Sequence, residues 1–185
     1  MTVAAAVLAA GEGSRFDGSE HKLRTPFRGR PLVSWAVDAA VEAGFDEIYV
    51  VSGAVPLDDL LPPGVRIVSN PRWAEGQATS LLAAVAAADA DGHDAVVVGL
   101  GDQPLVPAAA WRSVGAAAGT IVTATFDGER RPPVRLGRSV WSELADAGDA
   151  GARTLMRRRP DLVSEIPCRG NPVDIDTVED LRRWS

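Results

Sequence analysis

The chain has 185 residues and a formal net charge of −6; 46% of its residues are hydrophobic and 24% are charged. This composition is typical of a globular protein with a substantial core, and the length predicts one domain over residues 1–185. An acidic chain has no basic excess with which to neutralise phosphates, which argues against nucleic-acid binding. A single cysteine, Cys168, excludes an internal disulfide and favours a reducing compartment.

The apolar start of the chain differs from a secretion signal and from a membrane span. No positively charged segment precedes residues 3–10, and no apolar run reaches the roughly 18 residues that a spanning helix needs. We therefore expect a cytoplasmic protein with no membrane partner.

Short β-branched runs alternate with longer helical patterns along the chain. Strands are predicted at 3–9, 47–52, 65–70, 94–102 and 120–126, and helices at 32–44, 76–90, 107–119, 138–147, 151–159 and 177–184. Pro31 suits the first turn of the helix at 32–44, and Gly44 suits its C-terminal cap. The segment "RRPPV" at 130–134 predicts a loop or a strand edge. The alternation indicates βαβ units around a mainly parallel sheet.

Three polar loops follow predicted strands. They are the glycine-rich loop after residue 9, "SNPRWAEGQ" at 69–77 and "GDQP" at 101–104. Ligands of open parallel sheets bind where the carboxyl ends of the strands meet a switch in strand order. We therefore expect the three loops to converge on one crevice.

The glycine-rich loop reads "GEGSR" at 11–15. Phe16 stands where a dinucleotide fingerprint needs its third glycine, and no GK[ST] follows, so the loop is not a Walker A loop either. With Arg15 and Lys22, its backbone N–H groups could surround a polyphosphate. A glycine turn with solvent-facing charges fits the spacing equally well.

Three aspartates are candidate metal ligands. Asp102 follows the most hydrophobic predicted strand, and its carboxylate suits Mg²⁺, although a turn aspartate before a proline is also common. Asp174 and Asp176 stand two residues apart in "VDIDT" and would share one face of an extended segment. One of the two could complete a metal site while the other caps the helix that follows. The two histidines, His21 and His93, are expected at the surface without a catalytic role.

These motifs resemble the MobA-like nucleotidyltransferases over nearly the whole chain. The opening "LAAGEGSRF…K" is similar to their signature loop, and "GRPLVSWAVDAA" to the helix after it. "NPRWAEGQATSL", "LGDQP", "GDAGAR" and "DIDTVEDL" are most similar to the molybdenum cofactor cytidylyltransferase branch. The resemblance implies a three-layer, Rossmann-like α/β fold with a mixed, mainly parallel sheet. It also implies a Mg²⁺-dependent transfer of CMP from CTP to a molybdopterin-type phosphate, with release of pyrophosphate.

The resemblance implies a role for each site residue. Catalytic roles fall to Arg15, Lys22 and Asp102, and metal binding to Asp102 with Asp174 or Asp176. Asp149 and Arg153 would contact the acceptor, unless they form only a local ion pair. The implied nucleotide-binding residues are Leu8, Ala9, Ala10, Gly11, Glu12, Gly13, Asn70, Gly76, Gln77 and Ser80.

The chain departs from the branch in two places. The stretch between Arg15 and Lys22 is slightly longer than usual, and Pro132-Pro133 stands where a His-Pro pair is common. Two alternatives therefore stay open. One is a nucleotidyltransferase with another base, such as GTP, or with a sugar, polyol or phospholactate-like phosphate as acceptor. The other is a non-catalytic nucleotide-binding partner of a molybdoenzyme or of its chaperone.

Overall fold

A seven-stranded sheet forms the centre of the protein in the computed structural model, which describes residues 1–149 and 151–185. The strand order is β5-β4-β1-β6-β8-β7-β9. Among these described strands only β8 runs against its neighbours; the other pairings are parallel. The strands are β1 (Val3–Ala9), β4 (Glu47–Ser52), β5 (Arg66–Ser69), β6 (Ala95–Leu100), β7 (Ile121–Phe126), β8 (Glu129–Gly137) and β9 (Val163–Pro167). The expected mixed, mainly parallel α/β sheet is confirmed.

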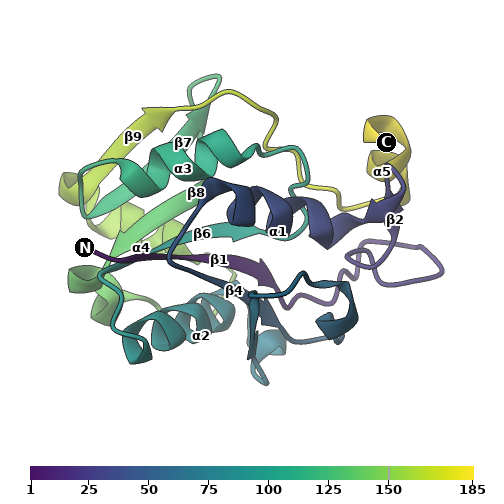
Figure 1. The fold of residues 1–185 in the computed structure, drawn as a ribbon, viewed down its shortest axis with the longest axis horizontal. Helices are drawn as coiled ribbons and strands as arrows, with labels where there is room; N and C mark the ends of the chain where they lie inside the picture. Colours follow the sequence, from purple (N-terminus) through teal and green to yellow (C-terminus); the bar gives the residue numbers. More distant parts are fainter. Residues whose placement is uncertain (150) are drawn as a thin grey trace.

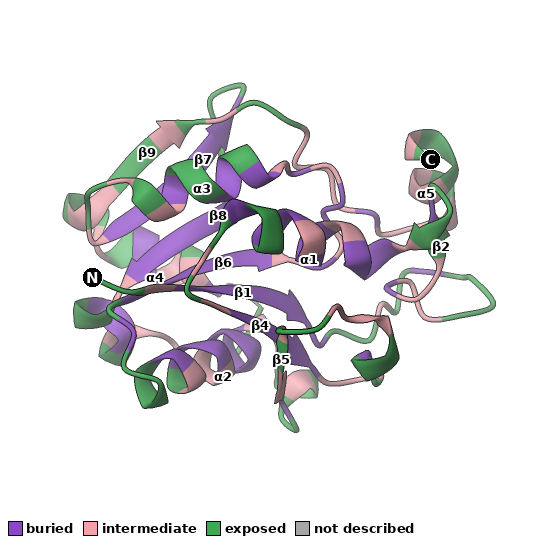
Figure 2. Ribbon diagram, in the orientation of Figure 1, coloured by how far each residue is buried: buried purple, intermediate pink, exposed green. Residues whose placement is uncertain are grey.

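Helices cover both faces of this sheet and make three layers (Figure 1). Alternate residues of a strand point to opposite faces, and in β1 this separates two cores. Ala5 and Val7 pack with α1 (Leu32–Ala43) and α3 (Ala108–Ala116). Ala6 and Leu8 pack with α2 (Gln77–Ala90) and α4 (Ala152–Arg158). Burial on both faces explains why β1 and β6 are almost continuously apolar, as the purple strands of Figure 2 show.

The residues at the ends of the predicted helices determine where each helix stops. Gly44 ends α1 in the left-handed conformation, with φ +79°, as its position in the sequence predicts. The helix expected at 138–147 is wrong: a 3-10 helix, η3, spans Arg138–Glu143, and Leu144 is already extended. Further single 3-10 turns are η1 (Asp58–Leu60), η2 (Trp73–Glu75) and η4 (Pro160–Leu162).

The segment "RRPPV" belongs to β8, which lies inside the sheet between β6 and β7. Its register with β7 pairs Thr123 with Val134 and then Ala124 with Arg131, so that Pro132 and Pro133 have no partner in the ladder. Proline has no N–H to donate, and a β-bulge is one of the few places where a strand tolerates it. The expectation of a loop or a strand edge is corrected in this way, because β8 is an inner strand.

The carboxyl ends of β1 and β6 point toward one end of the molecule (Figure 1). The small ladder of β2 (Pro26–Phe27) and β3 (Arg30–Pro31) and the last helix, α5 (Val178–Trp184), lie at that end. Arg28 links the two by donating from Nη2 to the carbonyl of Trp184 at 2.7 Å. Within residues 1–149 and 151–185, no helix has both the length and the apolar character that a membrane span requires.

Candidate functional site

A cleft of about 470 Å³ opens at the carboxyl end of β1 and β6. Its walls come from the glycine-rich loop, from the start of α2, and from the residues before α5. The three polar loops therefore meet in one crevice, as the sequence predicts. The predicted site residues that line it are Leu8, Ala9, Ala10, Gly11, Glu12, Gly13, Arg15, Lys22, Gly76, Gln77, Ser80, Asp102, Asp149 and Asp176.

The glycine-rich loop is folded back on itself. Phe16 is buried, and its N–H donates to the carbonyl of Gly13 at 2.9 Å. Gly13 has φ +69°, and a Cβ there would lie 3.1 Å from Cγ of Lys22, so glycine lets the lysine stem pass close to the loop. Among the described residues, no backbone carbonyl accepts from the N–H groups of residues 11–15. Such N–H groups at the end of a strand suit an anion.

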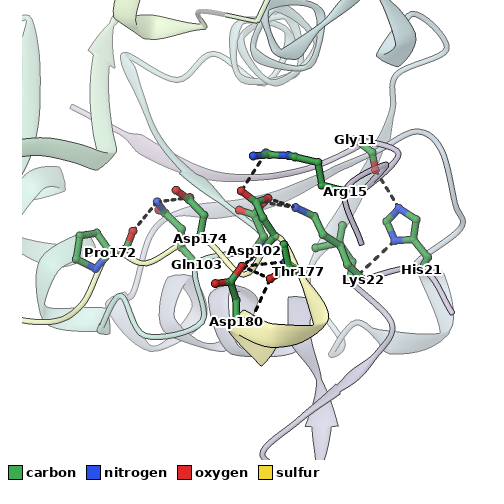
Figure 3. Close-up of polar contacts among 12 residues, drawn as sticks. Gly11, Arg15, His21, Lys22, Asp102, Gln103, Pro172, Asp174, Thr177 and Asp180 are labelled. Atoms are coloured by element: carbon green, nitrogen blue, oxygen red, sulfur yellow. Dashed lines mark hydrogen bonds and ion pairs between the residues drawn. The ribbon is translucent and has the colours of Figure 1, made fainter. Parts of the chain in front are cut away.

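Two cations and two carboxylates form a network across the cleft (Figure 3). Lys22 Nζ donates to Oδ2 of Asp102 at 2.7 Å and to Oδ1 of Asp176 at 2.9 Å. Arg15 Nη2 lies 2.9 Å from Oδ2 of Asp176. The Lys22 side chain is only 11% exposed, whereas that of Arg15 is 75% exposed. Lys22 is therefore a fixed charge in the floor of the cleft, and Arg15 is a charge at its mouth.

The electrostatics of this network favour a charged lysine. Burial by itself lowers the pKa of Lys22, but the adjacent Asp102 and Asp176 outweigh burial and raise it above its ordinary value. Asp102 accepts the hydrogen bond from Lys22 Nζ through Oδ2 only. Its Oδ1 is buried and receives no hydrogen bond from the described residues. An unpaired buried carboxylate oxygen is costly and suits a cation that arrives with a ligand.

Asp174 and Asp176 have different surroundings. Asp176 does not cap α5; Thr177 does, accepting from the N–H of Asp180 at 3.0 Å, while the Asp180 carboxylate accepts from the Thr177 N–H at 2.9 Å. This capping box frees Asp176 for the cleft. Asp174 accepts from Gln103 Nε2 at 2.9 Å, and burial, followed by the nearby charge of Asp102, raises its pKa. Figure 3 shows Asp174 beside Gln103, next to the network of Asp102 and Lys22.

The start of α2 presents Ser80 to the cleft. Asn70 is 3% exposed and does not line the cleft. It donates through Nδ2 to the hydroxyl oxygens of Thr79 and Ser80, both at 2.9 Å, and its Oδ1 accepts from the N–H of Arg72 at 3.0 Å. All its polar atoms are thus used within the protein, so the structure places Asn70 behind the wall as a support for Ser80. The Ser80 hydroxyl keeps its own proton to donate.

Gly76 holds the loop of Asp149 against α2. Its φ is +110°, and a Cβ there would lie 2.5 Å from the carbonyl carbon of Gly148. The N–H of Ala78 donates to the Gly148 carbonyl at 2.9 Å. The close backbone approach brings Asp149 into the cleft wall beside Gln77, and only glycine permits that approach.

Arg153 lies outside this cleft. It lines a smaller neighbouring pocket that shares Leu8, Gln77 and Leu100 with the cleft. No ion pair joins Arg153 to Asp149 in the part of the chain that the structure describes. The alternative of a local ion pair between them is therefore not supported.

His21 has a role that the sequence does not reveal. Its Nε2 lies 3.0 Å from the carbonyl of Gly11, and its Nδ1 accepts from the N–H of Leu23 at 3.3 Å. These contacts assign the proton to Nε2. Burial lowers the pKa of His21, so the neutral ring ties the glycine-rich loop to the segment of Lys22. The other histidine, His93, is 6% exposed, which corrects the expectation of a surface position.

A second acidic group lies at the opposite end of the strands, near the amino ends of β4 and β6. Glu47, Asp91 and His93 place ligand atoms within 4.8 Å of one another. Both carboxylates are already engaged by Arg66, whose Nη1 lies 2.5 Å from Asp91 Oδ2 and 3.4 Å from Glu47 Oε1. The group is separate from the cleft, and the guanidinium already supplies the cation that it needs.

A three-layer α/β fold whose glycine-rich loop faces paired carboxylates has the architecture of a nucleotidyltransferase. The chain matches the family model of the MobA-like NTP transferase domain over residues 5–163. It therefore belongs to the MobA-like NTP transferase family, which confirms the family that the motifs resemble.

Relatives of the whole chain carry several names. Nicotine blue oxidoreductase from Paenarthrobacter nicotinovorans is 34% identical over 98% of this chain and 95% of the relative. Rv0371c from Mycobacterium tuberculosis H37Rv is similar in structure, with a TM-score of 0.85 at 30% identity, over 100% of this chain and 97% of that one. Its complex with manganese gives 0.81 at 28%, over 100% and 98%. A nucleotidyl transferase from Methanothermobacter (Mth528) gives 0.84 at 27%, over 98% and 95%.

Proposed function

We propose that the protein transfers CMP from CTP to the phosphate group of a molybdopterin-type acceptor and releases pyrophosphate, with Mg²⁺ as cofactor. The observation that carries the proposal is the network of Lys22, Asp102 and Asp176 opposite a glycine-rich loop whose N–H groups have no backbone acceptor among the described residues. Two cations and these N–H groups suit a triphosphate, and the carboxylates suit a divalent ion that accompanies it.

The residues present fit Mg²⁺. Asp102 would contribute its buried oxygen, which receives no hydrogen bond from the described chain, and Asp176 or Asp174 would contribute a second hard oxygen donor. Mg²⁺, when bound there, would neutralise phosphate charge. The manganese complex of Rv0371c supports a divalent metal in this family.

The chemistry asks the protein mainly for position and charge. The acceptor phosphate attacks the α-phosphorus of CTP, the bond from this phosphorus to the bridging oxygen breaks, and pyrophosphate leaves. A phosphate monoester has its second pKa near about 6 and is already mostly dianionic at neutral pH. The protein therefore needs no general base. Lys22 and Arg15 would hold the departing phosphates and stabilise the charge that develops on them.

The start of α2 would select the base. Ser80 can donate its hydroxyl proton, and Gln77 can both donate and accept, which matches the edge of cytosine. A base with the wrong donor pattern would leave these polar groups unpaired.

A second candidate function is oxidoreductase activity, which the name of the 34% identical relative from Paenarthrobacter nicotinovorans suggests. The carboxylates around Lys22 give no reason for electron transfer, so we rank this candidate second. A third candidate is a non-catalytic nucleotide-binding partner of a molybdoenzyme.

One set of assays tests all three candidates. Pyrophosphate release is measured with each of the four nucleoside triphosphates, with and without Mg²⁺, against a panel of phosphorylated acceptors. We expect turnover with CTP and a pterin-type phosphate only. A parallel assay follows the reduction of nicotine blue, the compound in the name of that relative, with a reduced nicotinamide dinucleotide as the electron donor. Dye reduction without pyrophosphate release would support the oxidoreductase, and nucleotide binding with no turnover in either assay would support the partner protein.

A further inference from the structure

The pocket beside the nucleotide cleft, here called the β8 pocket, holds about 220 Å³. It is continuous with the cleft, because Leu8, Gln77 and Leu100 line both. A molecule in the β8 pocket would therefore lie next to a nucleotide in the cleft. The volume lies below the roughly 300–1,000 Å³ of a site for a whole drug-sized ligand, so it fits one ring system.

The β-bulge of β8 shapes this pocket. The ladder between β7 and β8 skips Pro132 and Pro133 at the level of Thr123, and the pairing of β6 with β8 ends at Val98 and Val134. The end of β6 is therefore left open beside the bulge. Bulges commonly re-aim strands next to functional sites.

The floor of the pocket is apolar. Four buried aliphatic side chains from α2, β6, β8 and α4 form it: Leu81, Val98, Val134 and Met156. Thr123, which also lines it, uses its hydroxyl within the strands, at 3.2 Å from the Ala124 carbonyl. Such a floor suits the face of a flat ring better than the hydroxyl groups of a sugar or polyol, which would lose their hydrogen bonds to water there.

The rim of the pocket is positively charged. Two of its four arginines are paired: Arg130 with Glu165 at 2.6 Å, and Arg131 with Glu129 at 3.2 Å. The other two, Arg153 and Arg157, have no carboxylate within 4.0 Å in the described ranges. They stand four residues apart on α4, where like charges face each other and destabilise the helix slightly. A bound anion would offset that repulsion.

We propose that the β8 pocket binds the ring of the acceptor, and that Arg153 and Arg157 select an acceptor that carries negative charge on or near this ring, in addition to the phosphate that reacts. This inference rests on the proposed transferase function and narrows its acceptor. It excludes sugar and polyol phosphates, whose bodies match neither the apolar floor nor the charged rim. The two arginines that select the charge lie on α4, and the floor that receives the ring comes from α2, β6, β8 and α4.

Binding to the full-length protein tests the inference separately from turnover. The probes are a pterin carboxylate and the matching hydroxymethyl pterin, which differ in charge but share one ring, and a hexose phosphate. Affinity is measured by pterin fluorescence with CTP absent and present. We expect the carboxylate to bind about tenfold more tightly than the neutral pterin, because charge-assisted contacts to guanidinium groups are strong. The hexose phosphate should compete no better than inorganic phosphate, because only its phosphate matches the rim.

The double variant Arg153→Gln/Arg157→Gln should bind both pterins equally. Arg158→Gln is the matched control: Arg158 belongs to the same helix, does not line the pocket, and donates only to the carbonyl of Glu143 among the described residues. It should keep the preference. Equal affinity of the wild type for the two pterins, a preference that survives in the double variant, or a hexose phosphate that competes better than inorganic phosphate would overturn the inference. If the preference holds but no acceptor gives pyrophosphate release, the proposed transfer fails while the binding assignment stands.

Discussion

The ammonium group of Lys22 is the counter-ion of Asp102, with Nζ 2.7 Å from Oδ2, and the same nitrogen lies 2.9 Å from Asp176. A lysine so placed neutralises two carboxylates that a divalent ion would also use under the proposed function. Metal and lysine would then compete for the charge of Asp102 and Asp176 until a triphosphate offers the lysine another partner.

Replacing Lys22 by methionine should tighten metal binding and weaken nucleotide binding. The variant keeps the apolar stem but leaves Asp102 without its cation and Asp176 with Arg15 alone. We expect Mn²⁺ alone to bind the variant about tenfold more tightly than it binds the wild type, because it gains the close charge contact that Lys22 gives up. CTP should bind the variant about tenfold more weakly, because it loses one close charge contact. Calorimetry measures both affinities. Arg15→Met is the comparison: Arg15 is mostly exposed and pairs with Asp176, so its effect on Mn²⁺ should be smaller. Unchanged Mn²⁺ affinity in Lys22→Met would contradict the competition.

Asp102→Asn should abolish turnover while the fold is retained. The amide keeps the size of the side chain but cannot supply the charge that a metal and Lys22 both need. Loss of a metal carboxylate should lower kcat by about 10²-fold or more. The rate of pyrophosphate release measures kcat, and a thermal melt shows whether the variant is folded. A folded variant with a kcat within a few-fold of the wild type would remove Asp102 from the proposed site.

Ser80→Ala should reduce selectivity for the base more than it reduces the rate with CTP. Asn70 already donates to the Ser80 oxygen, so removal of the hydroxyl takes away one donor to the base and also leaves the buried amide of Asn70 one acceptor short. We expect the wild type to prefer CTP over GTP and ATP by at least about tenfold in kcat/KM, and the variant to lose most of that ratio. The measurement is kcat/KM for the three nucleotides. A wild-type preference for GTP would reject cytidylyl transfer.

Gly76→Ala should destabilise the protein and disturb the loop of Asp149. A Cβ at this position meets the carbonyl carbon of Gly148 at 2.5 Å, and φ is +110°. We expect a loss of about 1–3 kcal/mol in the free energy of unfolding, from backbone strain together with displacement of the loop. Urea titration measures it. Gly92→Ala is a comparison for the cost of a positive φ, because Gly92 has φ +78° and a Cβ there would meet no described atom within 4 Å. The two variants should differ, and equal losses would show that the approach to Gly148 contributes nothing.

Acidification should reduce the stability that the contacts of His21 with Gly11 and Leu23 contribute. Burial holds the pKa of His21 below its ordinary value of 6.5, so the unfolded chain takes up a proton first as the pH falls. The unfolded state is then favoured, and the stability that neutral His21 contributes is lost between pH 6.5 and the lower pKa of the folded state. His21→Gln, which can still donate to Gly11, should lose less stability than the wild type between about pH 7.5 and about pH 5. Urea titrations at both values test this, and a larger loss in the variant would contradict the sign.

The strands and helices that pack on both faces of the sheet are well marked in the sequence. Residues 3–9, 32–44 and 76–90 carry apolar periods that tertiary packing reinforces. β9 (Val163–Pro167) and β8 are less visible. β9 lies at the edge of the sheet and is mostly exposed, so it has no apolar pattern. β8 contains two prolines, which are typical of loops unless a bulge accommodates them.

The candidate site could likewise be predicted only in part from the sequence. Loops that follow strands could be expected to converge, because sheet topology alone brings them together. Pairwise contacts could not be expected: Lys22 and Asp176 are 154 positions apart, and nothing in their spacing says that they meet. Whether Asp176 caps α5 or faces the cleft depended on Thr177 and Asp180, whose capping box settles it. The support that Asn70 gives to Ser80 likewise depends on side-chain directions that a sequence does not carry.

The position of β8 has a consequence for how the chain is assembled during synthesis. β8 follows β7 in the sequence but lies between β6 and β7 in the sheet. The strands β1, β4, β5 and β6 can pair as soon as residue 100 has emerged, since their partners precede it. Until β8 docks, β6 presents an open edge to other chains. The half of the protein that carries the glycine-rich loop can thus pair its strands first, whereas a nascent chain whose emerged part ends between residues 100 and 129 still presents the open edge of β6.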